Sequence, residues 1–206
     1  MASNKHATIA YHDAASEWTA PFSIDNIGFV YLRLIQHNEP QQLVQVDVQV
    51  HGPTVFVRLM PSSGAWPFLL RNETQHTVVF MQTASPTESQ RSTRDTNPKR
   101  YVLKPRSKMK YAWDYPADPD KYIRLQINGS ERVINILEIG SLLPFKFAAR
   151  DNLSAGVVSL DVRADETTQT LVISDYTESK SNFKLLRDTG AAPGVGTVAA
   201  ANAGHG

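Results

Sequence analysis

The sequence predicts an all-β protein made of stacked antiparallel β-sandwich repeats. Three observations lead to this fold class. Apolar and polar residues alternate with a period of two over most of the chain, and Gly, Pro, Asn and Asp separate the alternating runs. Part of the chain also repeats at an offset of about 112–114 residues. At most, Lys180–Arg187 is expected to form a short helix.

The strand candidates are recognised by their alternation. In Leu43–His51 the valines at 44, 46, 48 and 50 alternate with polar residues, which places four β-branched side chains on one face. Asn128-Gly129 predicts a two-residue hairpin, because type I′ turns need positive φ at both positions. Arg132–Ile139 has apolar residues on both parities and is expected to be a strand buried on both faces. The other candidates are Phe22–Asp25, Phe29–Ile35, Thr54–Met60, Phe68–Arg71, Val78–Gln82, Tyr101–Lys104, Lys108–Trp113, Tyr122–Ile127, Val157–Arg163 and Thr170–Ser174.

The internal repeat defines the expected domain organisation. The matched pairs are Phe22/Ile134, Ile24/Ile136, Ile27/Ile139 and Gly28/Gly140 at offset 112, and Val44/Val158, Val46/Leu160, Asp47/Asp161, Val48/Val162, Val57/Leu171 and Leu59/Ile173 at offset 114. Repeats of this kind bury their faces partly on their neighbours. We expect an N-terminal extension (1–15), the closing half of a penultimate repeat (16–64), a complete last repeat (66–187) and a flexible tail (188–206).

Composition excludes several classes of protein. The 206 residues contain no Cys, which rules out disulfides and thiolate metal sites, and 21 basic against 20 acidic residues argue against a dedicated DNA binder. No apolar run reaches the length of a membrane span, and the first residues lack a signal-peptide pattern, so we expect a soluble protein of a reducing compartment. The polar segment Thr83–Lys99 and the Gly/Ala-rich segment Asp188–Gly206 are expected to be unpacked.

Catalytic and metal motifs are not found in the sequence. It lacks the nucleophile-elbow, phosphate-loop and His-Glu-x-x-His patterns, and its six His residues show no ligand spacing, so we expect no enzyme activity and no cofactor. Asp114, Asp118 and Asp120 are close in sequence, as in calcium-binding loops of β-sandwiches. Their spacing matches no EF-hand loop, and prolines 116 and 119 favour a tight turn, so no metal is predicted.

Several sequence blocks, in order, resemble one family. Glu17–Gly28 (EWTAPFSIDNIG) resembles a W-S-x-x-F-S-hydrophobic-D…G block of the vacuolar protein sorting-associated protein 13 family. Trp66–Thr74 (WPFLLRNET) resembles its P-F-x-hydrophobic-x-N-x-[ST] block, and Tyr111–Pro116 (YAWDYP) its Y-A-W-D-x-P block. Lys121, Arg132 and Ile136–Gly140 fit the same region. Thr19 replaces the usual Ser, and the resemblance covers roughly residues 16–187.

The resemblance implies a non-catalytic function. The matched region is the adaptor-binding domain, an array of β-sandwich repeats in very large bridge-like lipid transfer proteins. Membrane-resident adaptors with a proline-x-proline motif dock on its last repeats and recruit the lipid channel. This places the protein at the cytoplasmic face of organelle membranes, at membrane contact sites. Asn72 occupies the family's characteristic Asn position.

The expected peptide site lies on two apolar strands. We expect an adaptor strand to add to an edge near Phe68–Arg71 and Val78–Phe80, with Asn72 holding the shape of that edge. Asn72 is equally compatible with a structural turn residue, since Asn side chains bond backbone groups. The residues predicted to bind the peptide or shape its groove are Asn72, Phe68, Leu70, Arg71, Val79 and Phe80. Each aromatic residue of this region also fits a plain sandwich core.

Residues 91–110 form a basic stretch. They hold eight basic residues and only Asp95 as an acid, a net charge of +7. Lys104, Arg106, Lys108 and Lys110 share one parity, so a single strand would present them on one side. One interpretation is binding to anionic lipid, and the other is an edge strand protected from aggregation by lysines. Peripheral membrane binding is therefore the alternative function, and an extracellular glycan-binding sandwich is a third.

Overall fold

The computed structural model describes residues 5–10, 12, 17–35, 41–62, 64, 66–84, 98–185 and 199–200. The all-β prediction is confirmed. The strands are β1 (His6–Ala7), β2 (Phe22–Ser23), β3 (Gly28–Leu34), β4 (Gln42–His51), β5 (Thr54–Pro61), β6 (Phe68–Asn72), β7 (Val78–Thr83), β8 (Tyr101–Leu103), β9 (Lys108–Tyr111), β10 (Tyr122–Ile127), β11 (Ser130–Ile134), β12 (Gly140–Phe147), β13 (Gly156–Asp165), β14 (Thr168–Asp175), β15 (Phe183–Lys184) and β16 (Ala199–Ala200). Most of the two segments predicted to be unpacked lies outside the described residues.

Strands β6 to β14 form a two-sheet sandwich, called the sandwich below. One sheet has the order β11-β10-β7-β8 and the other β12-β13-β14-β6-β9. All neighbours are antiparallel except β14 and β6, which run parallel. The core between the sheets takes side chains from both, including Leu70, Phe80, Tyr111, Leu125 and Ile173, each 0% exposed. Each such side chain contributes roughly 1.5–3 kcal/mol through burial, so this core dominates the stability of the fold.

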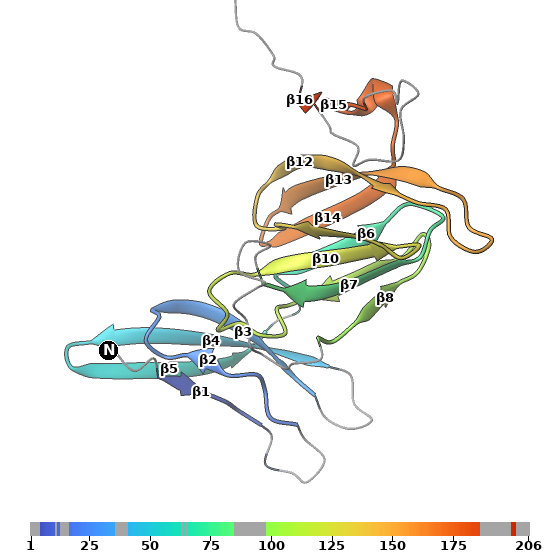
Figure 1. Cartoon of the computed structure of the whole chain (residues 1–206). Helices are drawn as coiled ribbons and strands as arrows, with labels where there is room; N and C mark the ends of the chain where they lie inside the picture. The colour runs from blue at the N-terminus through green and yellow to red at the C-terminus, as the bar shows by residue number, and fades with distance from the viewer. Residues whose placement is uncertain are drawn as a thin grey trace, which may run out of the picture.

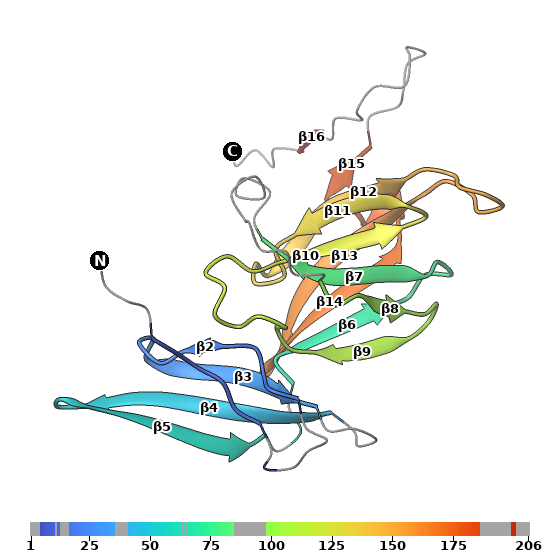
Figure 2. The ribbon, with the colours of Figure 1, turned by 60° about the horizontal axis from the view of Figure 1, so that its bottom comes forward.

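Strands β1 to β5 form a smaller unit, the N-terminal module. Its three-stranded sheet has the order β3-β4-β5, and the β1–β2 pair lies against it. Phe22, Leu32, Val46 and Val48 make its small core, at 2% exposure or less. Figures 1 and 2 show the module at one end of the sandwich, and in Figure 2 β5 lies on the side away from it. Strand β1 falls in the segment that the sequence predicts as an extension.

The internal repeat has the same strand register in both copies. Gly28 pairs with Val48 in the module, and their counterparts Gly140 and Val162 pair in the sandwich. Both glycines have positive φ, 126° and 134°. Strands β3-β4-β5 therefore correspond to β12-β13-β14, and an irregularity between Leu142 and Phe145 accounts for part of the change in offset. The exact limits of the repeats stay a prediction.

Of two elements predicted next to each other in the chain, the turn is confirmed and the strand that follows it is wrong. The Asn128-Gly129 hairpin is confirmed, with φ of 49° and 81° and Ile127 paired with Ser130. The continuous strand Arg132–Ile139 is wrong, because β11 ends at Ile134 and the Asn135 side chain accepts a 3.0 Å hydrogen bond from the Leu137 amide. That turn buries Ile136 but leaves Leu137 and Ile139 exposed. The apolar residues on both parities thus belong to a turn and not to a doubly buried strand.

The expected C-terminal helix is also not formed as predicted. Phe183 and Lys184 lie in β15, which pairs with β16. A three-residue 3₁₀ helix, Glu178–Lys180, comes just before it. In the part of the chain that the structure describes, no helix has the length and apolar character needed to cross a membrane.

Candidate functional site

Asn72 is a buried residue at the end of β6, and its side chain hydrogen-bonds two separate turns. It is 1% exposed, and its Nδ2 donates to the carbonyls of His76 and Lys104 at 2.7 and 3.0 Å. Its Oδ1 accepts from the backbone amide and the hydroxyl of Thr74 at 3.0 and 2.8 Å. The side chain therefore joins the turn after β6 to the chain leaving β8. Every polar atom of the amide has a partner, as the structural interpretation of this residue requires.

The other predicted peptide-site residues lie in interior strands. Phe68, Leu70 and Phe80 are at most 5% exposed, Val79 is half-buried, and the exposed Arg71 forms a 2.6 Å ion pair with Glu73. Strand β6 is paired with β14 and β9, and β7 with β10 and β8. The strand-accepting edge predicted here is therefore wrong, because both sides of these strands are already hydrogen-bonded. Only an indirect, groove-shaping role is left to the buried members.

Phe68 does line a groove, at the junction of the module and the sandwich. This junction groove has a volume of about 330 Å³, and its walls include Ile27, Phe29, Tyr31, Phe68, Trp113 and Pro116. Residues 28–31 of β3 line it consecutively, and among the described strands β3 pairs only with β4. Ile27 and Phe29 are 70% and 64% exposed. An apolar groove thus runs beside an unpaired strand edge, which is an arrangement suited to an added peptide strand.

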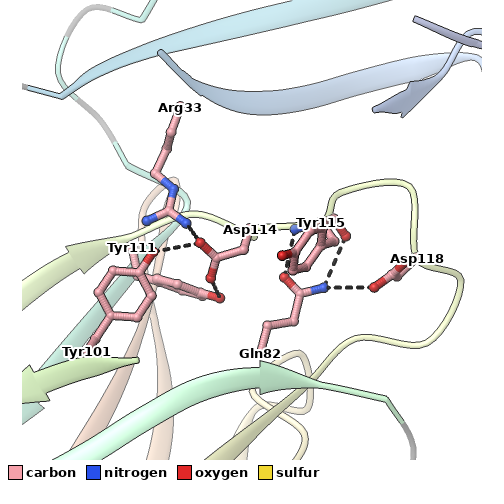
Figure 3. A network of polar contacts seen from close by, with 7 residues as sticks. All are labelled: Arg33, Gln82, Tyr101, Tyr111, Asp114, Tyr115 and Asp118. Atoms are coloured by element: carbon pink, nitrogen blue, oxygen red, sulfur yellow. Dashed lines mark hydrogen bonds and ion pairs between the residues drawn. The ribbon is translucent and has the colours of Figure 1, made fainter. Parts of the chain in front are cut away.

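An ion pair crosses the same junction. Arg33 of β3 contacts the Asp114 carboxylate, which follows β9, and the two side chains are only 7% and 8% exposed. Asp114 also accepts hydrogen bonds from the hydroxyls of Tyr101 and Tyr111 at 2.6 and 3.1 Å. The guanidinium lies 5.2 and 5.4 Å from the centroids of these two rings. Figure 3 shows Arg33 reaching from the module to this carboxylate. We call Arg33–Asp114 the junction pair.

The segment that carries Asp114 is held from the sandwich side as well. Gln82 at the end of β7 is 5% exposed. Its Nε2 donates to the Tyr115 carbonyl at 3.0 Å, and its Oε1 accepts from the Tyr115 amide at 2.9 Å. Gln82 Nε2 also lies 3.4 Å from an Asp118 carboxylate oxygen (Figure 3). Residues 113–116 are called the junction loop below. They are fixed to the sandwich by hydrogen bonds between the Gln82 side chain and the Tyr115 backbone.

Burial sets the protonation of the two tyrosines. Loss of solvent raises the pKa of Tyr111 strongly, against a smaller opposing effect of the Arg33 charge. The same cause raises the pKa of Tyr101. Both hydroxyls therefore keep their protons at neutral pH and serve as donors to Asp114. A carboxylate with two hydroxyl donors and a guanidinium is a well-compensated buried charge.

The basic residues do not share one strand face. Strand β8 ends at Leu103 and β9 begins at Lys108, so Lys104 and Arg106 lie in the turn between them, where Arg106 has φ 53°. A single strand that carries all four basic residues is therefore not formed. Lys108 and Lys110 are exposed on β9, the outermost strand of its sheet. They lie where edge-protecting lysines are expected.

Two of the three clustered aspartates, Asp114 and Asp118, have protein partners. Asp114 is engaged by Arg33 and the tyrosines, and Lys121 Nζ donates to the carbonyls of Pro116 and Asp118 at 3.2 and 2.5 Å. Among the residues that the structure describes, no three His, Asp or Glu side chains gather in a way that could hold a metal ion.

The fold and the groove define a β-sandwich recognition module. The family model for "Vacuolar-sorting associated protein 13, adaptor binding domain" matches residues 1–120, which is more than half of the chain. The chain belongs to this family. It is 35% identical over 193 residues to "Intermembrane lipid transfer protein VPS13" of Chaetomium thermophilum, covering 92% of this chain and 6% of that protein. It is 29% identical over 112 residues to "Intermembrane lipid transfer protein vps13B" of Dictyostelium discoideum, covering 53% and 2%.

The coverage limits which activity belongs to this chain. It spans only 6% and 2% of the two relatives. The matched family model describes an adaptor-binding domain, and the matched region includes both residues of the junction pair. The YAWDYP motif contains Asp114, but the sequence patterns indicated no role for Arg33 or Gln82. The family blocks flanking the junction were the available signal.

Proposed function

We propose that this module docks proline-x-proline peptides of membrane-resident adaptors, in the junction groove along β3. The observation that carries the proposal is the edge of β3 with which no other described strand pairs, bordered by exposed and aromatic apolar side chains in an adaptor-binding domain. Docking would recruit a bridge-like lipid transfer protein to the cytoplasmic face of organelle membranes, at contact sites.

The chemistry of the groove suits such a peptide. Proline has no amide hydrogen, so a proline-x-proline segment bonds an edge through its central residue and directs its ring atoms elsewhere. Phe68 and Trp113 pack edge to face with centroids 5.0 Å apart, and they form an aromatic wall opposite Phe29 and Ile27. Aromatic-lined grooves are the common receptors for proline-rich segments.

Asn72 takes an indirect part in this proposal. It lies at the far end of β6 from Phe68, about 13 Å away for an extended strand. Its hydrogen bonds fix the turns at that end of the sandwich. We expect replacement to disturb the sheet that presents Phe68, and so to weaken binding without any contact to the peptide.

A titration with a fluorescent proline-x-proline peptide tests the proposal, beside a peptide with both prolines replaced by alanine. We expect micromolar binding of the first peptide only. Phe29→Ser should weaken it at least fivefold, because Phe29 is exposed in the groove. Val102→Ser is the matched control, since Val102 is 53% exposed on β8 of the sandwich. Equal loss in both variants, or binding of both peptides, would overturn the assignment.

The basic surface provides the competing outcome. Reversing Lys108 and Lys110 to Glu removes two exposed charges from β9. Peptide binding should persist in this variant. Loss of binding to anionic vesicles, with no peptide binding by the unmodified chain, would instead support the membrane-surface alternative.

A further inference from the structure

We propose that the junction pair Arg33–Asp114 sets the width of the junction groove and so controls peptide affinity without touching the peptide. The inference rests on the proposed function for its binding readout. It assigns Arg33 and Asp114 as positioning residues. The structural part, that this pair fixes the module against the sandwich, can be tested separately.

The two walls of the groove come from different units. One wall is β3 of the module, with Phe29 and Tyr31, and the other is Phe68 with the junction loop residues Trp113 and Pro116. The groove therefore has a defined width only if β3 and the loop keep a fixed separation. A change in the angle between the module and the sandwich would open or close it.

The junction loop is a shared wall. Trp113 and Pro116 face the groove, and they also line a second depression together with Arg33 and Asp114. Gln82 fixes the loop to the sandwich through both backbone polar groups of Tyr115. The sandwich side of the junction is thus rigid, and the position of β3 depends on what binds the module to the loop.

Arg33 is suited to this role by its surroundings. It lies on β3, the same strand that lines the groove, and its side chain is 7% exposed. Its charge is balanced by Asp114, and its guanidinium lies over the rings of Tyr101 and Tyr111. A planar guanidinium can bond a carboxylate and stack on rings at once, which a Lys ammonium does less well.

Removing the Arg33 guanidinium leaves the buried Asp114 carboxylate without an opposite charge beside it. That charge is relieved by admitting water, so the module should move away from the loop. The tyrosine hydroxyls would still hold Asp114 on the sandwich side. The expected change is therefore a loosened junction between two folded units, and not the unfolding of either.

The test measures the junction and the affinity in the same variants. The chain has no Cys, so spin labels can be placed at Thr54→Cys in the module and Asn152→Cys in the sandwich, both exposed positions. We expect a narrow distance distribution by pulsed electron paramagnetic resonance in the parent. It should broaden in Arg33→Gln, with peptide affinity falling about tenfold, while Arg33→Lys gives a smaller change in both. Lys110→Gln, which removes an exposed charge from β9, is the control.

The outcomes separate the two proposals. An unchanged distance distribution in Arg33→Gln overturns the inference, and so does a broadened distribution with unchanged affinity. A broadened distribution in a protein whose parent form binds no peptide supports the junction pair as the inter-unit contact and overturns the proposed function. Circular dichroism identifies a variant that has unfolded, and Arg33→Lys then supplies the decisive comparison because it leaves no buried charge without a partner.

Discussion

The two copies of the repeated three-strand unit share a register but differ in burial. Leu59 of β5 is 50% exposed, whereas its counterpart Ile173 of β14 is 0% exposed. Val57 and Leu171 show the same difference, 42% against 2%. Strand β14 is covered because it pairs with β6 and faces the second sheet. Among the described strands, β5 pairs only with β4. Alternation therefore encodes which face is apolar, and neighbouring strands decide whether that face is buried.

The predicted domain organisation would explain this difference in burial. In the sandwich, β6 pairs with β14 and the second sheet covers its apolar face. If residues 16–64 are only the closing half of a repeat, β5 lacks the equivalents of β6 and of that second sheet among the described residues. The division into a half repeat and a complete repeat stays a prediction. The difference in exposure between the matched residues of β5 and β14 can be tested by substitution.

Truncation of the matched pair should give the largest contrast. Ile173→Ala should destabilise the sandwich by about 2–5 kcal/mol, because a fully buried methyl-rich side chain leaves a cavity. Leu59→Ala should cost less than about 1 kcal/mol, since half of that side chain is already in water. Urea denaturation followed by circular dichroism measures both. Similar losses in the two variants would mean that β5 is covered in solution.

Replacing Asn72 should affect both the stability of the sandwich and the affinity for the peptide. Asn72→Ala should cost about 2–4 kcal/mol, because it removes the hydrogen bonds of a buried amide to the His76 and Lys104 carbonyls and to the amide of the buried Thr74. Peptide affinity should fall as well. Thermal melting and titration measure the two effects, with the exposed Asn152→Ala as control. If neither melting temperature nor affinity changes, the assignment of this residue is incorrect.

Alkaline pH should lower the free energy of unfolding through Tyr101 and Tyr111, which lie in the sandwich next to the junction. The folded-state pKa of both Tyr101 and Tyr111 is raised by burial, so their contribution to stability is complete below the unfolded value of about 10 and decreases as pH rises above it. Above pH 10 the slope approaches about 1.4 kcal/mol per pH unit for the buried Tyr111, and the half-buried Tyr101 adds a smaller contribution. Unfolding free energy measured from pH 8 to 11 should show the decline, and Tyr111→Phe should reduce its slope. An unchanged slope would exclude this tyrosine as its source.

The smallest difference between the two copies should be found at the two matched glycines. Gly28 and Gly140 have φ of 126° and 134°, with no atom within 4 Å of an added Cβ. Replacing either by Ala should therefore cost about 1–3 kcal/mol of backbone strain and no steric clash. We expect closely similar values when each variant is compared with the parent by denaturation. A clearly larger loss at one position would show that the copies differ in backbone freedom there.

The sequence predicted correctly those features that a short pattern of neighbouring residues specifies. The Asn128-Gly129 turn follows from the need for positive φ, and the repeat register follows from alternation plus a shared Gly and Asp. Strand β12 was not predicted, because Pro144 and the irregular pairing between Leu142 and Phe145 interrupt its period. The junction groove was also not predicted, since it joins β3 to Phe68 and to the junction loop, which lie in separate, later parts of the chain.

The all-β class, the offset of the repeat and the apolar faces follow from the sequence alone, because alternation and turn residues act over a few neighbouring positions. The tertiary structure was needed to show that β6 and β7 are interior strands, that among the described strands β3 pairs only with β4, and that Arg33 meets Asp114. These features depend on which strands become neighbours. That choice is made by the burial of whole faces against one another, over distances in the chain at which no local pattern carries information.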